Sequence, residues 1–187
     1  MLKKRKLLLN IADKSILQHT YESSLNSKMS LKTIILVDSI ELFTHCKTFT
    51  DDVLMTSKKH KNGTERIYEY VKSSETNFNI VNMQADEPFT DHKLIDAIFK
   101  QLMDGNEIVT AVYEISDNII DPNRVKVVLD KNDFALYFSR HEIPYNFSKK
   151  NKSKKNIHIG IYGYTTNSLN RINSYNDSYL GIDENLE

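Results

Sequence analysis

The chain of 187 residues is long enough for one domain with a sizeable core, and slightly short for two. Its 25 basic and 25 acidic side chains cancel, so no global field favours nucleic acid, and any anion must be bound by a local cluster. The composition, with 40% apolar residues, 10 tyrosines and 8 phenylalanines, excludes disorder along the whole chain. We therefore expect a single domain over residues 1–187 and no nucleic-acid partner.

The N-terminal stretch MLKKRKLLLNIADK is basic at first and then briefly apolar. Asn10 and Asp13 leave the apolar run too short and too polar for the core of a signal peptide. No other segment approaches the roughly 20 apolar residues of a membrane span. The single cysteine, Cys46, offers neither an internal disulfide nor a metal-ligand spacing, and we interpret it as buried rather than reactive. These features predict a soluble, cytoplasmic protein without membrane insertion.

Helix and strand patterns alternate in the first half of the chain, which predicts parallel crossover units. Helices are indicated by apolar residues at helical spacing after a capping side chain, and strands by short continuous apolar runs. In chain order we expect a helix capped by Asp13 or Ser15 that runs to about Lys28, a strand over 33–37, a helix from Thr64 and a strand over 78–83.

The second half begins with the best-defined helix and then becomes dense in strands. The helix presents Leu94, Ile98 and Leu102 on one face, and Gly105 lies just past its end. Segments rich in β-branched or aromatic residues predict the strands that follow, at 108–113, 125–129, 135–138 and 157–164. This arrangement favours an α/β fold with a mixed sheet or a β-rich subdomain.

A lysine-rich run, SKKNKSKKN over residues 148–156, lies between two of these strands. A binding patch for an anionic polymer or a membrane surface is one interpretation of it. We favour a solvated loop, because no aromatic residues lie between the lysines to stack on bases.

The acidic turn NMQADEP places Gln84, Asp86 and Glu87 directly after a strand. Ligands gather at the carboxyl ends of strands in open parallel sheets, so Asp86 is a natural ligand for Mg²⁺. The alternative is that Asp86 and Glu87 cap the following helix or its approach, since acidic residues are common at helix starts. Spacing alone leaves these two interpretations balanced.

The loop HKNGTER is a second candidate site. A glycine before a helix lets backbone N–H groups approach an anion, and Arg66 is suited to bind a phosphate. By itself, however, Asn62-Gly63-Thr64 is also an ordinary turn with a helix cap, and this simpler interpretation is favoured.

A third candidate combines YFSRHEIP with HIGIYGY. Arg140 and His158 suit a carboxylate, and tyrosine hydroxyls suit a sugar. Against this, a single histidine among apolar strand residues is more often structural, and Gly160 and Gly163 can simply serve strand packing.

Four segments, taken together, resemble one enzyme family both in their order along the chain and in their amino-acid sequences. They are NGTER, NMQADEP, NRVKVVLDKNDFALYFSRHEIPYNF and HIGIYGYTTNSL. They are similar to the 3-deoxy-manno-octulosonate cytidylyltransferases, the CMP-Kdo synthetases of Gram-negative envelope synthesis. The resemblance extends from Lys6 to Glu187, and the last three segments are specific to this family among sugar nucleotidyltransferases.

This resemblance implies a Rossmann-like nucleotidyltransferase fold, usually homodimeric, and an enzyme that uses CTP, Mg²⁺ and Kdo. In the family, the anomeric hydroxyl of Kdo attacks the α-phosphorus of CTP in line, and pyrophosphate leaves. The product, CMP-Kdo, is the donor for lipopolysaccharide assembly. Such chemistry requires that two anions be positioned and that phosphate charge be neutralised.

The family's functional positions fall on particular residues of this chain. The resemblance puts the magnesium-binding aspartate at Asp86, and it implies that Asp86 and Arg140 carry the reaction. It puts the nucleotide-binding positions at Lys6, Asn62, Gly63, Thr64, Arg66 and Gln84, and the sugar-acid pocket at Arg140, His158, Tyr162 and Glu187.

The chain also departs from the family's pattern. Family members begin with a strand and a phosphate loop of the form IPARxxSxRxPGKPL, which this chain enters only at Lys6. We therefore expect the family's first strand, most of the phosphate loop and a later magnesium-binding aspartate to be absent. Ala85 stands where the family has glycine, and its methyl is expected to crowd a close backbone approach. The alternative to an active enzyme is a shortened, non-catalytic relative that retains ligand binding or dimer formation.

Overall fold

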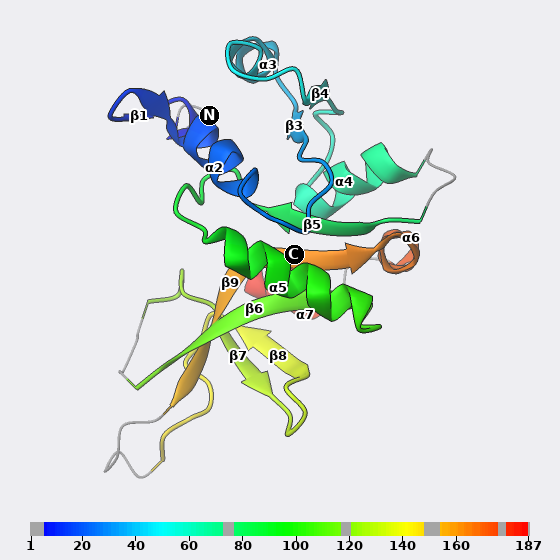
Figure 1. Cartoon of the computed structure of the whole chain (residues 1–187). Helices are drawn as coiled ribbons and strands as arrows, with labels where there is room; N and C mark the ends of the chain where they lie inside the picture. Colours follow the sequence, from blue (N-terminus) through cyan, green and yellow to red (C-terminus); the bar gives the residue numbers. More distant parts are fainter. Residues whose placement is uncertain (1–5, 73–76, 117–120, 148–153, 176–178, 187) are drawn as a thin grey trace. The chain divides into compact units, whose positions relative to one another are not determined.

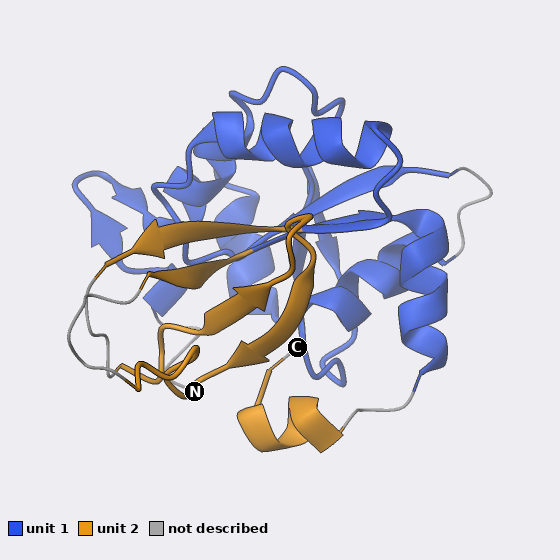
Figure 2. Cartoon of the chain, turned by 90° about the horizontal axis from the view of Figure 1, so that it is seen from below, with its two compact units in different colours: residues 1–109, 161–176 blue, residues 110–160, 177–187 orange. Residues whose placement is uncertain are grey.

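The computed structural model describes residues 6–72, 77–116, 121–147, 154–175 and 179–186. These residues form two compact units (Figure 2). Unit 1 comprises Met1–Val109 and Ile161–Asn176, and unit 2 comprises Thr110–Gly160 and Asp177–Glu187.

Unit 1 contains most of the helices (Figure 1). Its elements lying wholly within the unit are, in chain order, β1 (Asn10–Ile11), β2 (Lys14–Ser15), α2 (Ile16–Ser24), β3 (Ile35–Val37), α3 (Ile40–Cys46), β4 (Val53–Met55), α4 (Gly63–Val71), β5 (Asn79–Met83), α5 (His92–Met103) and α6 (Thr166–Ser174).

The first expected helix is confirmed as α2, with Ser15 as its cap: the Ser15 hydroxyl oxygen accepts from the N–H of Gln18 at 3.1 Å. The helix ends at Ser24, earlier than expected. Beyond it, the carboxylate of Asp96 accepts from the backbone N–H of Lys28, and this contact with α5 takes the chain out of the helix.

β3 and β4 pair in parallel, as the alternating pattern predicts. The sequence pattern did not indicate α3 or β4, because they have only seven and three residues and few of these are buried. The core beneath them contains Cys46, which is fully buried as expected, and burial raises the pKa of its thiol to about 11. The other buried members of this cluster are Leu17, Tyr21, Ile35, Val37, Leu42 and Val53.

β5 pairs antiparallel with β9 (Lys155–Thr165), and helices cover both faces of this ladder. On one face α5 approaches closely, because a side chain at Gly163 would overlap Ile98 and lie 3.0 Å from Leu102. The packing interpretation of this glycine is therefore confirmed. On the other face Tyr164 packs with residues of α4 and α6, and the cluster comprises Ile67, Val71, Tyr164 and Leu169.

The β3–β4 ladder is separate from the sheet that contains β5. Among the described residues, no strand joins them. Even so, Leu36 of β3 packs against the same cluster as Ile80 of β5. The two ladders therefore border one apolar core while each leaves an edge unpaired.

Unit 2 is mainly antiparallel sheet. β7 (Lys126–Leu129) pairs with β8 (Ala135–Ser139) and with the start of β9, and β6 (Ile108–Ile115) also pairs with β9. A short helix, α7 (Tyr179–Glu184), ends the described chain. Of the two alternatives expected for the strand-dense second half, the β-rich subdomain is the one that unit 2 forms.

The interpretation of the lysine-rich run as a solvated loop is wrong at its C-terminal end. Residues 148–153 lie outside the described residues, but Lys155 belongs to β9, and its side chain is 0% exposed. Its ammonium is bound to the carboxylate of Glu142. Lys154, by contrast, is exposed and pairs with Glu114 at 2.9 Å. Alternation along the strand turns one of two adjacent lysines inward.

Candidate active site

The acidic turn lies at the end of β5, where the sequence placed it. The carbonyl oxygen of Gln84 accepts from the N–H of Glu87 at 3.2 Å, which closes the turn. Asp86 does not cap the next helix; Asp91 does so by accepting from the N–H of Lys93. The helix-cap alternative for Asp86 is therefore wrong.

Lys6 is the hydrogen-bond partner of Asp86. Its ammonium donates to Oδ2 of the carboxylate at 2.8 Å, and this contact raises the pKa of Lys6. Two residues expected from the family resemblance to serve the nucleotide and the metal are thus brought together.

A magnesium ion fits this turn only as a shared site. Among the described residues, no three His, Cys, Asp or Glu side chains gather to hold a metal. Mg²⁺ commonly takes one or two carboxylates and completes its shell with water and substrate phosphates. Asp86, with a side chain 42% exposed, is a carboxylate that could serve as the protein's ligand in such a shell.

Ala85, which replaces the family's glycine, is partly buried against the core cluster beneath β3 and β4. Its carbonyl oxygen accepts from the hydroxyl of Thr20 in α2 at 3.0 Å. The methyl group is accommodated by packing on this side of the turn.

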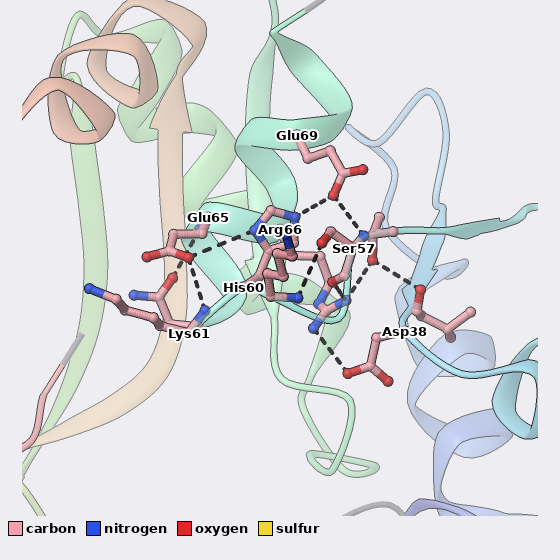
Figure 3. A network of polar contacts seen from close by, with 11 residues as sticks. Asp38, Ser57, His60, Lys61, Glu65, Arg66 and Glu69 are labelled. Carbon is pink, nitrogen blue, oxygen red and sulfur yellow. Dashed lines mark hydrogen bonds and ion pairs between the residues drawn. The ribbon is translucent and has the colours of Figure 1, made fainter.

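The loop before α4 is a polar network (Figure 3). Asn62 caps the helix by accepting from the N–H of Glu65 at 2.9 Å, and Gly63 is the first helical residue, so the turn-and-cap interpretation is confirmed. Thr64 is buried, and its hydroxyl lies 3.0 Å from that of Tyr164 in β9. These contacts fix the N-terminus of α4, whose dipole favours an anion.

Arg66 is held by the ends of two strands. Its guanidinium donates to Thr56 Oγ1 at 2.5 Å and to the carbonyl of Ser57 at 3.4 Å, both just after β4 (Figure 3). It also pairs with Asp38, just after β3, at 3.3 Å. With 18% of its side chain exposed, Arg66 ties α4 to both strands and leaves only part of its donor set for a phosphate.

His60, the first residue of the loop HKNGTER, belongs to the same network together with Glu69, which the sequence analysis missed. Glu69 accepts from the ring of His60 and from the N–H of Ser57 at 2.8 Å. The hydrogen bond from His60 is the main reason that the pKa of Glu69 is lowered. The spacing of Glu65 and Glu69, four residues apart on α4, is a signal that both reach back to the loop.

Asn82 is a second residue that the sequence analysis passed over. It pairs across the ladder with Tyr162, whose ring stacks on Tyr164 at 6.0 Å between centroids. Its amide nitrogen is buried and finds no hydrogen-bond partner within the described part of the chain. Gln84 lies just past the end of β5 and begins the acidic turn.

In unit 2, His158 is a neutral side chain. Its Nε2 lies 2.8 Å from the hydroxyl of Thr110, and its ring meets Phe138 edge-on at 5.3 Å. Burial lowers its pKa to about 4. It therefore hydrogen-bonds without supplying the positive charge that recognition of a carboxylate would use.

Arg140 follows β8 and is held by main-chain carbonyls. Its guanidinium donates to the carbonyls of Pro122, Glu184 and Asn185 at 3.0, 2.6 and 3.0 Å. Glu187, the remaining expected pocket residue, lies outside the described residues. Glu184, which the sequence analysis did not single out, accepts a hydrogen bond from the backbone N–H of Arg140 at 2.8 Å.

Comparison with known proteins decides the family. A model described as cytidylyltransferase matches residues 4–181. The chain belongs to the cytidylyltransferase family. The mixed α/β nucleotidyltransferase fold and the enzyme class expected from the sequence are thereby confirmed.

Two curated relatives of this cytidylyltransferase chain share one name. The 3-deoxy-manno-octulosonate cytidylyltransferase of Thermodesulfovibrio yellowstonii is 36% identical, over 97% of this chain and 77% of that protein. The enzyme of the same name from Elusimicrobium minutum is 37% identical, over 98% of this chain and 77% of that protein. The resemblance seen in the four sequence segments is confirmed.

A solved structure supports the same assignment. It is a CMP:2-keto-3-deoxy-manno-octonic acid synthetase in complex with CTP, which superposes with a TM-score of 0.89 at 29% identity. The match covers 97% of this chain and 76% of that protein. Within the described part of the chain, no helix has the length and apolarity that crossing a membrane requires.

Proposed function

We propose that the chain couples CTP to Kdo, giving CMP-Kdo and pyrophosphate. The observation that carries this proposal is the 36–37% identity, over nearly the whole chain, to proteins named for this transfer. Assembly as a homodimer and a role in lipopolysaccharide synthesis are part of the same proposal, because they accompany that family.

In the proposed reaction, the anomeric hydroxyl of Kdo forms a new bond to the α-phosphorus of CTP. The bond from that phosphorus to the pyrophosphate oxygen breaks, and the hydroxyl proton is released. Little covalent chemistry is left for the protein, so positioning and charge neutralisation supply most of the acceleration.

Side chains of unit 1 are suited to the nucleotide. Lys6 places an ammonium beside the acidic turn, and the N-terminus of α4 presents backbone N–H groups after Asn62. Arg66 adds a second cation with donors to spare. Gln84 and Asn82 offer amide groups that can hydrogen-bond a base or ribose.

A bound Mg²⁺ would neutralise phosphate charge, and Asp86 would be its protein ligand. Residues of unit 2 are suited to bind the second substrate, Kdo. Arg140 has N–H groups left to bind the carboxylate of Kdo, and neutral His158 can hydrogen-bond an uncharged part of the sugar.

A second candidate is a protein that binds CTP without turnover. Among the described residues, β3 and β5 each pair with a strand on one side only, and this favours the second candidate, because an edge strand opens locally more easily than one paired on both sides. The two candidates differ in whether pyrophosphate is produced.

The test is pyrophosphate release by the purified, folded chain with CTP, Kdo and Mg²⁺. Turnover should fall at least about a hundredfold in Asp86→Ala, because a metal ligand is lost. The neighbouring exposed residue provides the control, and Glu87→Ala should remain within about threefold of the parent. Absence of magnesium-dependent release by a sample that binds CTP would replace the enzyme with the non-catalytic candidate.

A further inference from the structure

The guanidinium of Arg140 is held without being neutralised. Three of its N–H groups meet main-chain carbonyls, those of Pro122, Glu184 and Asn185, at 2.6–3.0 Å. Among the described residues, no carboxylate lies within ion-pair distance of it, although Glu184 is adjacent. One N–H of each terminal nitrogen therefore remains for another acceptor, and the positive charge is still available.

The carboxylate of Glu184 is turned to other partners. It accepts from the hydroxyls of Tyr137 and Ser139 at 2.8 and 2.5 Å, and from the backbone N–H of Arg140 at 2.8 Å. These hydrogen bonds, that from Ser139 first, lower the pKa of Glu184, so the group is charged at neutral pH. The hydrogen bond that the Tyr137 hydroxyl donates to this carboxylate raises the pKa of Tyr137.

This polar docking is what attaches α7 to β8. The helix has only six residues and none of them is buried, so apolar packing does not hold it in place. Glu184 at its end, by contrast, makes three side-chain hydrogen bonds with the end of β8. The Glu184 carboxylate therefore helps to fix the carbonyls of Glu184 and Asn185, and with them the plane of the guanidinium that donates to both.

The backbone of Arg140 is fixed from both sides. Its N–H is bound by Glu184, and its carbonyl accepts from the ammonium of Lys126 at 2.5 Å. Lys126 is 1% exposed and donates a second hydrogen bond to the carbonyl of Asp121. The residue is thus anchored at the main chain and at the side chain, which is the preorganisation that a selective anion contact requires.

We infer that Glu184 is a positioning residue for Arg140, and that it aims the two remaining guanidinium N–H groups at the carboxylate of a sugar acid. This inference rests on the proposed function for the identity of the ligand. By linkage, a sugar acid bound at Arg140 also stabilises the docking of α7 to the same extent.

Titration calorimetry with Kdo, with the methyl ester of Kdo and with CTP tests the inference. Glu184→Ala should weaken Kdo binding about tenfold, because the guanidinium loses its fixed orientation. Affinity for CTP should stay within about twofold, and the uncharged ester should bind both proteins equally weakly. Glu184→Gln, which keeps a carbonyl acceptor for the hydroxyls, should lose less.

Asp183→Asn is the matched control, because it removes one negative charge from an exposed neighbour on the same helix. It should leave all three affinities unchanged. An unchanged affinity of Glu184→Ala for Kdo, or equal losses for Kdo and CTP, would overturn the inference.

A nuclear magnetic resonance measurement separates this inference from the proposed function. The Arg140 Nε–H, bonded at 2.6 Å, should exchange with solvent slowly in the parent and at least about tenfold faster in Glu184→Ala. A parent chain that binds CTP but not Kdo would contradict the proposed substrate. Equal exchange rates in the two proteins would contradict the positioning role, whatever the substrate.

Discussion

The ammonium of Lys6 lies 2.8 Å from a carboxylate oxygen of Asp86, although 80 positions separate the two residues in the sequence. Asp86 lies in the turn that follows β5, and Lys6 is the first described residue of the chain. The pair therefore joins the start of the described chain to the end of a strand at the candidate site.

Lys6→Gln should weaken CTP binding about tenfold while hardly changing the melting temperature. The pair is exposed, so water replaces it at little cost, whereas triphosphate recognition loses a cation. Calorimetry and thermal unfolding measure the two effects. Lys14→Gln is the control, because it breaks an exposed pair of similar length with Glu22, away from the acidic turn. Equal CTP affinities for both variants would show that Lys6 does not meet the phosphates.

His158 should make the protein less stable as the pH falls from about 6.5 to about 4. Burial lowers its folded-state pKa, so the unfolded chain binds the proton first, and each step down in pH in this window favours unfolding. The contribution is roughly 1–3 kcal/mol. Urea unfolding at pH 7 and pH 4.5 should show a smaller pH effect in His158→Gln than in the parent. An identical pH dependence would mean that His158 is not buried as a neutral ring.

Lys155→Met should lower the free energy of unfolding by about 3 kcal/mol, because it leaves Glu142 without its cation beside a buried position. The pKa of Glu142, which Lys155 now holds below its usual range, should rise in the variant. The adjacent Lys154→Met removes only an exposed pair with Glu114 and should hardly change the free energy of unfolding. Urea unfolding of the two variants gives the comparison, and similar losses would contradict the inward orientation of Lys155.

Amide hydrogen exchange should reveal which N–H groups of β5 lack a partner strand among the described residues. The N–H of Thr166 bonds to the carbonyl of Phe78, so alternation along the antiparallel ladder directs Ile80 and Asn82 toward β9 and Val81 away from it. The Val81 amide should therefore exchange at least about tenfold faster than its two neighbours.

The edge of β3 should behave in the same way. Ile35 donates to the carbonyl of Asp52, and the carbonyl of Val37 accepts from the N–H of Thr56, which leaves Leu36 directed away from β4. Its amide should exchange faster than that of Ile35. Slow exchange at both Leu36 and Val81 would show that another strand already covers these edges.

The sequence by itself determined the elements that depend on neighbours along the chain. Ser15 and Asn62 cap helices because a side-chain oxygen reaches an N–H three residues later. The apolar residues of α5 recur at helical spacing, so this helix can be recognised from its own sequence. The motifs that identify the family are likewise continuous segments. The extent of α2 and the presence of α3 and β4 were not determined in this way, because short elements are set by the neighbours on which they pack.

The tertiary structure alone decided which side chains meet. Asp86 was balanced between a helix cap and a metal ligand until the fold assigned the cap to Asp91 and brought Lys6 to Asp86. Burial of Lys155 and the docking of Glu184 beside Arg140 likewise depend on strands and helices that are distant in sequence. Electrostatic and hydrogen-bond partners are set by distance in space, and local sequence patterns do not encode that distance.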